Sequence, residues 1–238
     1  MVFSSTGIAY LLLFLVLGFL SYRLFQYWTQ NRTTTSKFFF FLVLSFLLFA
    51  LIRVISVLFF VDNLQVLNAS IVAVSFIEGL AASIVAYLVI HIKFHQISPR
   101  IGFIIFFFLG ILATVLTVGI NYQPSIEESG AVDWGFAASE VGVLYLIIRF
   151  GIILITFVPL IIVIFQQFLS SKDHVTKKKS LGLSIIFLLG IGLGFIDFVL
   201  NNFLQISVAA YRDYTTIILS LFILLVTFFT QKPSYQLE

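Results

Sequence analysis

Four ionisable residues interrupt long apolar stretches of this chain and are the first candidates for chemistry. They are Arg53, Glu78, Arg149 and Asp197. If these stretches cross a membrane, each charge costs roughly 2.5–3.5 kcal/mol at the bilayer centre on insertion scales. Two cations and two anions are able to neutralise one another. The sequence therefore predicts ion pairs among the four.

The order of the segments suggests which residues pair. Neighbouring antiparallel helices favour Arg149 with Asp197 and Arg53 with Glu78, while the opposite pairing remains an alternative. At a rise of about 1.5 Å per residue, all four charges fall in the same half of a bundle. One interpretation is an internal network that fixes helix register. A second, compatible interpretation is a hydrated pocket that opens outward, in which Arg53 or Arg149 binds an anionic ligand group.

Further polar residues stand one helical turn from two of these charges. Tyr145 precedes Arg149 by four residues and Asn201 follows Asp197 by four, so each pair shares a helix face. The candidate ligand-binding or ion-pair network comprises Arg53, Glu78, Tyr145, Arg149, Asp197 and Asn201. No catalytic set accompanies it, so we expect a protein that is not an enzyme, with no cofactor. No metal site is expected either, because His91 and His95 have no further ligand nearby in sequence.

The composition indicates an integral membrane protein. Hydrophobic residues make up 61% of the 238 residues and charged residues 10%, against about half and a quarter in soluble domains. Continuous apolar runs of roughly 20 residues or more favour helices over the strands of a β-barrel. The predicted fold is all-α: a single polytopic domain of seven transmembrane helices, residues 1–238. The predicted helices are 7–29, 38–61, 70–92, 101–120, 141–168, 181–204 and 208–230.

The distribution of basic residues predicts the orientation. Loops on the cytoplasmic side of a membrane protein are rich in Lys and Arg. Arg212 is the single basic residue expected on the opposite side, among several acidic residues. The N-terminus is therefore expected outside and the C-terminus in the cytoplasm of a cell-membrane protein. The residues expected on the cytoplasmic side are Arg23, Arg32, Lys37, Lys93, Arg100, Lys172, Lys177, Lys178, Lys179 and Lys232.

Two connecting segments stand out from the short turns. "NYQPSIEESGAVDWGFAASE", Asn121 to Glu140, is predicted to be an acidic outside loop, with Trp134 and Phe136 as interfacial anchors or a lid. "SSKDHVTKKKS", Ser170 to Ser180, is predicted to be a basic cytoplasmic loop that attracts anionic headgroups, with a partner site as the alternative. Gly190-xxx-Gly194 is interpreted as a site of close helix packing.

The layout of residues 102–202 resembles a known family. It contains "GFIIFFFLGILATVLTVGINYQPS", a Gly-containing acidic stretch, "LYLIIRFGIILI", a Lys-rich turn and "LGLSIIFLLGIGLGFIDFVLNN". This order resembles the N-terminal seven-helix sensor region of prokaryotic histidine kinases. The resemblance implies an outward-facing sensory bundle with a cytoplasmic output. No phosphoacceptor helix or ATP-binding domain follows the seventh segment in this sequence, so either the output is a separate protein, or the chain is a detached relative or part of a longer protein.

The expected function is that of a sensor, a receptor-like protein or an interaction subunit. It would have an outward-facing polar pocket and signal to a separate cytoplasmic partner. The expected partners are the lipid bilayer, a cytoplasmic signalling protein or membrane subunit, and a small polar ligand from outside, but no nucleic acid. The alternative is a transporter or channel component for a small anionic or zwitterionic solute. Against it, Pro159 alone interrupts a predicted span, and no paired broken helices appear.

Overall fold

The computed structural model describes residues 4–135, 139–198, 200 and 206–229, without the side chains of 197, 198 and 229. Within these ranges seven α-helices are long and apolar enough to cross a membrane. The all-α prediction is confirmed apart from one short hairpin, and the helices indicate a multi-pass membrane protein. The elements are α1 (Ser5–Asn31), α2 (Thr34–Phe60), α3 (Leu64–Lys93), α4 (Pro99–Val118), β1 (Ser125–Ile126), β2 (Val132–Asp133), α5 (Glu140–Ser170), α6 (His174–Phe198) and α7 (Ala209–Phe229).

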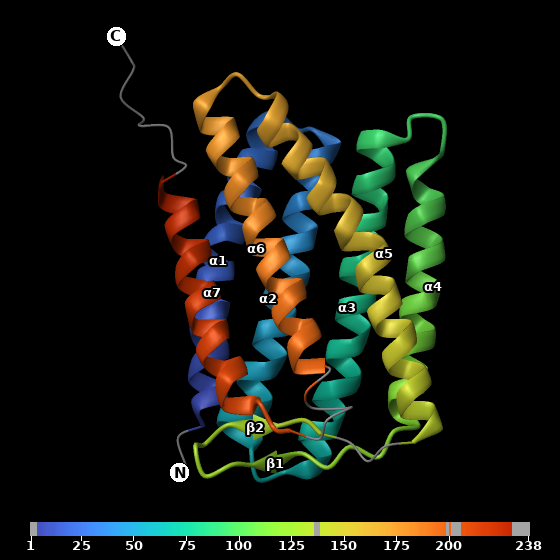
Figure 1. The fold of residues 1–238 in the computed structure, drawn as a ribbon, viewed down its shortest axis with the longest axis vertical. Helices are drawn as coiled ribbons and strands as arrows, with labels where there is room; N and C mark the ends of the chain where they lie inside the picture. Colours follow the sequence, from blue (N-terminus) through green and yellow to red (C-terminus); the bar gives the residue numbers. More distant parts are fainter. Residues whose placement is uncertain (1–3, 136–138, 199, 201–205, 230–238) are drawn as a thin grey trace.

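Six of the helices form a closed ring, and the fourth packs outside it (Figure 1). The ring runs α1, α2, α3, α5, α6, α7 and back to α1. Helix α4 packs on both α3 and α5. Helix α3 has the largest buried share of the seven. As a result α3 and α5, which are not consecutive in the chain, face one another directly.

Short capped turns make consecutive helices antiparallel. Helix α1 ends at Asn31, and Arg32 then takes a left-handed conformation with φ 50°. The side chain of Thr33 accepts a hydrogen bond from the N–H of Ser36 at 3.2 Å and so caps the start of α2. Asn63 caps α3 in the same way, accepting from Gln65. These turns allow each helix to pack against the preceding one.

Close glycine packing occurs between α3 and α4. A Cβ on Gly79 would lie 2.6 Å from the Cα of Gly110, and the reverse distance is also 2.6 Å. Neither position accommodates a side chain without moving backbone. The close packing predicted at Gly190 and Gly194 is wrong for the described part of the chain, where no atom lies within 4 Å of a Cβ built at either position. That face of α6 points away from the rest of the bundle, a rotation that sequence spacing does not specify.

The basic segment between α5 and α6 is mostly helical. Helix α5 continues to Ser170 and α6 begins at His174, so the predicted loop of residues 170–180 shortens to three residues. The carboxylate of Asp173 accepts hydrogen bonds from the backbone N–H and hydroxyl of Thr176, at 3.0 and 2.6 Å. This cap allows the helix to start ahead of the apolar run. The three lysines that follow are exposed on the first turns of α6.

The acidic segment between α4 and α5 contains an antiparallel hairpin, which lies across one end of the bundle (Figure 1). Ser125 pairs with Asp133 and Ile126 with Val132. Gly130 takes φ 77° in the turn, a conformation that favours glycine. Buried Val132 packs in a cluster with Val57 of α2 and Leu67 of α3. The segment is thus a folded cap on the bundle, which we call the hairpin (residues 121–135).

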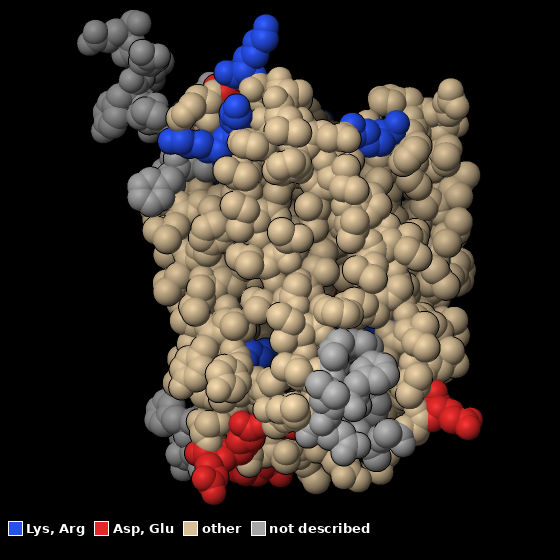
Figure 2. Space-filling view, viewed as in Figure 1, with Lys and Arg blue, Asp and Glu red and all other residues tan. Residues whose placement is uncertain are grey.

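Charges separate between the two ends of the bundle. On the face shown in Figure 2, Lys and Arg gather at the end opposite the hairpin and Asp and Glu at the hairpin end. We call these the basic end and the hairpin end. The basic end includes the α1–α2, α3–α4 and α5–α6 turns, with Arg32 and Lys172 in the first and last of these turns and Arg100 at the start of α4.

Candidate functional site

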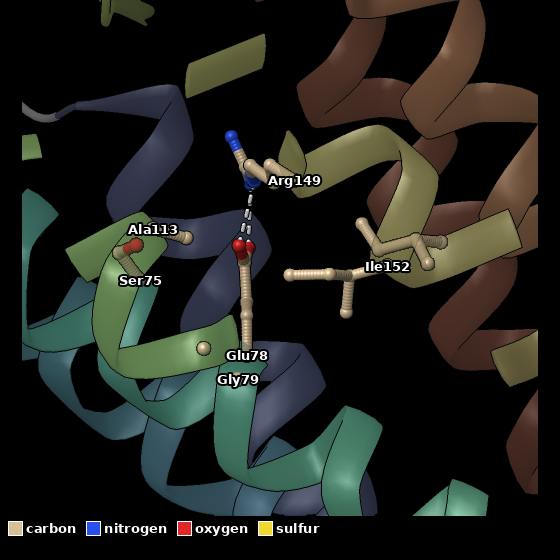
Figure 3. A pocket seen from close by; sticks show the side chains of 8 residues that line it. Ser75, Glu78, Gly79, Ala113, Arg149 and Ile152 are labelled. Atoms are coloured by element: carbon tan, nitrogen blue, oxygen red, sulfur yellow. Dashed lines mark hydrogen bonds and ion pairs between the residues drawn. The ribbon is translucent and has the colours of Figure 1, made fainter. Parts of the chain in front are cut away.

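An ion pair joins α3 to α5 inside the bundle (Figure 3). The Nε of Arg149 donates to Oε2 of Glu78 at 2.7 Å, and its Nη2 donates to Oε1 at 2.6 Å. Two parallel hydrogen bonds of this kind fix both distance and orientation. The side chains of Arg149 and Glu78 keep 36% and 21% of their surface exposed. The pair therefore fixes the register of α3 against α5, although both side chains remain partly exposed.

A small cavity adjoins the ion pair (Figure 3). It has about 10 Å³ for the centre of a water-sized molecule. That volume is about the minimum for a single water. The cavity thus has room for about one water molecule and is too small in this conformation for an organic ligand. Its lining residues are Ser75, Glu78, Gly79, Gly110, Ala113, Arg149, Ile152 and Ile153.

The pairing differs from the favoured prediction. Glu78 binds Arg149, so the expected Arg53–Glu78 pair is wrong. The physical reason is the ring order, which places α5 beside α3. Arg149 already has a bidentate partner, although it was expected to pair with Asp197. The side chain of Asp197 and all of Asn201 lie outside the described residues, so their roles stay predictions.

Arg53 of α2 is buried beneath the hairpin, and only 7% of its surface is exposed. Its Cζ lies 4.0 Å from the ring centroid of Trp134 and 5.9 Å from that of Phe49. Its Nε and Nη1 are buried without a hydrogen-bond acceptor in the described part of the chain. The Nε1 of Trp134 is likewise buried without an acceptor there. Two N–H groups of Arg53 and one of Trp134 thus have no hydrogen-bond acceptor among the described residues.

Trp134 was predicted as an interfacial anchor or a lid. The structure places its ring over Arg53 and against the cluster of Val57, Leu67 and Val132. This arrangement fits a lid, because the indole covers a charged group of the bundle. Phe136, predicted to act with it, lies outside the described residues.

A hydroxyl and carboxylate network fastens the hairpin to α1 and α7. Buried Asp213 accepts hydrogen bonds from the hydroxyls of Ser5 and Thr6, both at 2.7 Å. The hydroxyl of Thr6 also accepts from the N–H of Val132 at 2.9 Å, and Nη2 of Arg212 donates to the Val132 carbonyl at 2.5 Å. Sequence reasoning missed Asp213, because nothing local in the sequence relates it to residues more than 200 positions earlier.

Tyr145, the remaining predicted site residue, belongs to the core next to the ion pair. It is 2% exposed, and the Cζ of Arg149 lies 5.8 Å from its ring centroid. It packs in one cluster with Tyr122, which follows α4. Burial, and then the neighbouring Tyr145, raises the pKa of the Tyr122 phenol above its ordinary range. Both phenols therefore extend the polar region around Glu78 and Arg149.

The chain's similarity to known proteins adds no family to these observations. No protein-family model matches the sequence, and no curated protein matches it. The likeness to histidine-kinase sensor regions stays a prediction. The function is therefore inferred from the arrangement of the hairpin, Arg53 and the Glu78–Arg149 pair.

Proposed function

We propose that this chain is a multi-pass protein of the cell membrane, with the hairpin end outside and the basic end in the cytoplasm. The proposal is supported by the separation of charge between the two ends (Figure 2). Cytoplasmic loops of membrane proteins are enriched in Lys and Arg. In this orientation the N-terminus of α1 lies outside, and Lys177, Lys178 and Lys179 on α6 face the cytoplasm and anionic headgroups.

Within that membrane the protein acts as a sensor or receptor-like subunit that signals to a separate cytoplasmic partner. The observation that carries this proposal is the set of contacts between the hairpin and three helices. Gly130 accepts from Ser5 of α1, Val132 accepts from Arg212 of α7, and Trp134 covers Arg53 of α2. A ligand that displaces the hairpin therefore changes the outer ends of three helices at once.

The helices themselves provide the route to the cytoplasmic side. Helix α2 is continuous over 27 residues, or about 40 Å at 1.5 Å per residue. The Glu78–Arg149 ion pair joins α3 to α5 in a fixed orientation, and α5 leads to the basic turn before α6. A movement at the hairpin end is in this way transmitted to the basic end by rigid helices. The lysine-bearing turns there are the surface that a cytoplasmic partner binds.

A cross-linking experiment tests the coupling. The chain has no cysteine, so Glu127→Cys and Ser207→Cys, whose side chains are in contact, can be joined by the shortest bifunctional methanethiosulfonate. Hydrogen–deuterium exchange of residues 93–100 and 171–180 is then compared with and without the link. We expect slower exchange at both basic turns, while the two single-cysteine variants show no change. Exchange altered only in the hairpin contradicts the sensor proposal.

The alternative, a transporter or channel component, is favoured by one observation, the incomplete burial of Glu78 and Arg149. Partly exposed charges inside a membrane bundle often line solute paths. Uptake of small anions or zwitterions into liposomes that contain only this protein distinguishes the two functions. If the parent chain supports uptake and the Arg149→Gln variant does not, transport replaces sensing as the proposed function.

A further inference from the structure

We propose that Arg53 and Trp134 form a binding site for an oxyanion, a carboxylate or phosphate group that arrives from the hairpin end. The inference deepens the proposed sensor function and rests on it, because it gives the chemical class of ligand that the hairpin recognises. It concerns the buried cation rather than the ion pair of α3 and α5.

The contact with Trp134 leaves hydrogen-bond donors of Arg53 without an acceptor among the described residues. The Cζ of Arg53 lies over the ring of Trp134, 4.0 Å from its centroid. Cation–π stacking uses the face of a guanidinium and leaves its N–H groups pointing outward in the plane. Nε and Nη1 belong to different edges of the group, and both are buried without an acceptor among the described residues.

The unsatisfied donors are unusual for a buried site. Buried polar groups in proteins nearly always have a hydrogen-bond partner, and each exception calls for an explanation such as an ion or water. Here two donors of Arg53 and the indole N–H of Trp134 lack one in the part of the chain that the structure describes. All three are donors, so each calls for an acceptor oxygen such as that of a carboxylate or phosphate, whereas another cation or donor satisfies none of them.

The surrounding charge also favours an anion. Among the described residues, Arg212, Glu78 and Arg149 are charged side chains near enough to act on Arg53. Glu78 already accepts two hydrogen bonds from Arg149. No carboxylate in the described ranges forms an ion pair with Arg53, since the two pairs there are Arg149–Glu78 and Arg212–Asp213. The positive charge of Arg53 thus has no carboxylate partner in the described part of the chain, and carboxylate and phosphate are the groups that Arg binds best.

The position of Trp134 links binding to the hairpin. Trp134 directly follows β2, which ends at Asp133. With only 7% of Arg53 exposed, an anion reaches the guanidinium when the hairpin shifts. Binding then changes the position of Trp134 and of the strand that contacts α1 and α7. The site is therefore placed to convert capture of an anion into movement of the outer helix ends.

Tryptophan fluorescence provides a direct test, because the chain has two tryptophans. Trp28 lies near the basic end, stacked on Phe40, so Trp28→Phe leaves Trp134 as the sole reporter. The full chain is placed in phosphatidylcholine nanodiscs and titrated with acetate or inorganic phosphate, against sodium chloride at equal ionic strength. We expect a saturable change in Trp134 emission with an oxyanion and none with chloride.

Two arginine variants give matched controls. Arg53→Gln should abolish the response, while Arg23→Gln, whose Cζ lies over the Phe19 ring at 5.2 Å, should retain it. If Arg53→Gln fails to fold, Arg53→Lys replaces it. Lysine keeps the charge without the planar donors, and we expect at least about tenfold weaker binding, equivalent to one charged hydrogen bond.

Nanodiscs containing phosphatidylglycerol identify the source of the oxyanion. An altered Trp134 emission in these discs without added anion, again lost in Arg53→Gln, supports a lipid phosphate as the ligand. A response only to acetate or phosphate in solution supports a soluble ligand. No saturable response in any disc overturns the proposal, as does a response unchanged in Arg53→Gln.

The proposal is also overturned if Trp134 emission responds to the oxyanion only in the Asp197→Asn variant. That result would mean that the carboxylate of Asp197 occupies Arg53 in the parent chain. The cross-linking experiment on Glu127 and Ser207 needs no anion, so failure here leaves the sensor proposal standing and testable on its own.

Discussion

The guanidinium of Arg149 on α5 and the carboxylate of Glu78 on α3 are joined by two hydrogen bonds of 2.7 and 2.6 Å. The two helices are separated in sequence by α4, which packs outside the ring. The pair therefore ties two non-consecutive helices together at a fixed register. It is also the most directly testable part of the bundle.

Removing one member of this pair should destabilise the protein more than removing both. Glu78→Ala should lower the free energy of unfolding by about 1.5–3 kcal/mol, the range for hydrogen bonds to charged groups. The double variant Glu78→Ala with Arg149→Ala should recover part of that loss, because no charge is left unpaired. Thermal unfolding in detergent measures both. Strict additivity of the two single variants would show that the pair is not coupled.

Gly79 and Gly110 should tolerate no side chain. Gly79→Ala places a Cβ 2.6 Å from the Cα of Gly110, and relieving the overlap should cost about 1–3 kcal/mol. Gly190→Ala is the matched control, because nothing lies within 4 Å of its Cβ and alanine favours helices by about 1 kcal/mol. Unfolding temperatures should fall for the first and hold or rise for the second. Equal effects would contradict the α3–α4 packing.

Asp213 should be needed to hold the hairpin end together. In Asp213→Ala the hydroxyls of Ser5 and Thr6 lose a charged acceptor, with an expected cost of about 1.5–3 kcal/mol or more. Asp213→Asn keeps one acceptor oxygen and should be milder. Asp62→Ala, at an exposed position, should stay within about 0.5 kcal/mol of the parent. Faster proteolysis in the hairpin is the second readout. Unchanged proteolysis would argue that the Asp213 network does not hold the hairpin in place.

Tyr122 should ionise at a higher pH than an ordinary phenol. Burial raises its pKa. A raised pKa in the folded state means that its stabilisation is complete below the unfolded value, about 10, and is lost as pH rises above it. Absorbance at alkaline pH should show a late step that is missing in Tyr122→Phe. A titration identical in the two proteins would contradict the burial of this phenol.

Cysteine labelling should establish the orientation. Ser125 and Lys178 are both exposed, at the hairpin end and the basic end. In intact cells or sealed vesicles of known sidedness, Ser125→Cys should react with a membrane-impermeant maleimide from outside, and Lys178→Cys only after permeabilisation. The absence of native cysteine makes the parent chain the blank. Reversed labelling would invert the topology and place the Arg53 site on the cytoplasmic side.

The sequence by itself indicated a multi-pass membrane protein and the rough extent of its helices. A long apolar run has few alternatives to a helix when backbone groups must pair within the segment, and each predicted run overlaps one of α1 to α7. Composition also identified Arg53, Glu78 and Arg149 as exceptional, since charges within such runs are costly. The sequence analysis predicted a loop at residues 170–180, but the cap formed by Asp173 lets α6 begin within that segment.

Tertiary structure decided which of these residues meet. Pairing depends on the order of helices around the ring and on the rotation of each about its axis, and both are set by packing of the whole chain. The outward position of α4 brings Arg149 to Glu78. The folding of the hairpin over α2 carries Trp134 onto Arg53, 81 positions away in the sequence. Periodicity places a residue on a face of its helix, but only the assembled bundle determines what that face meets.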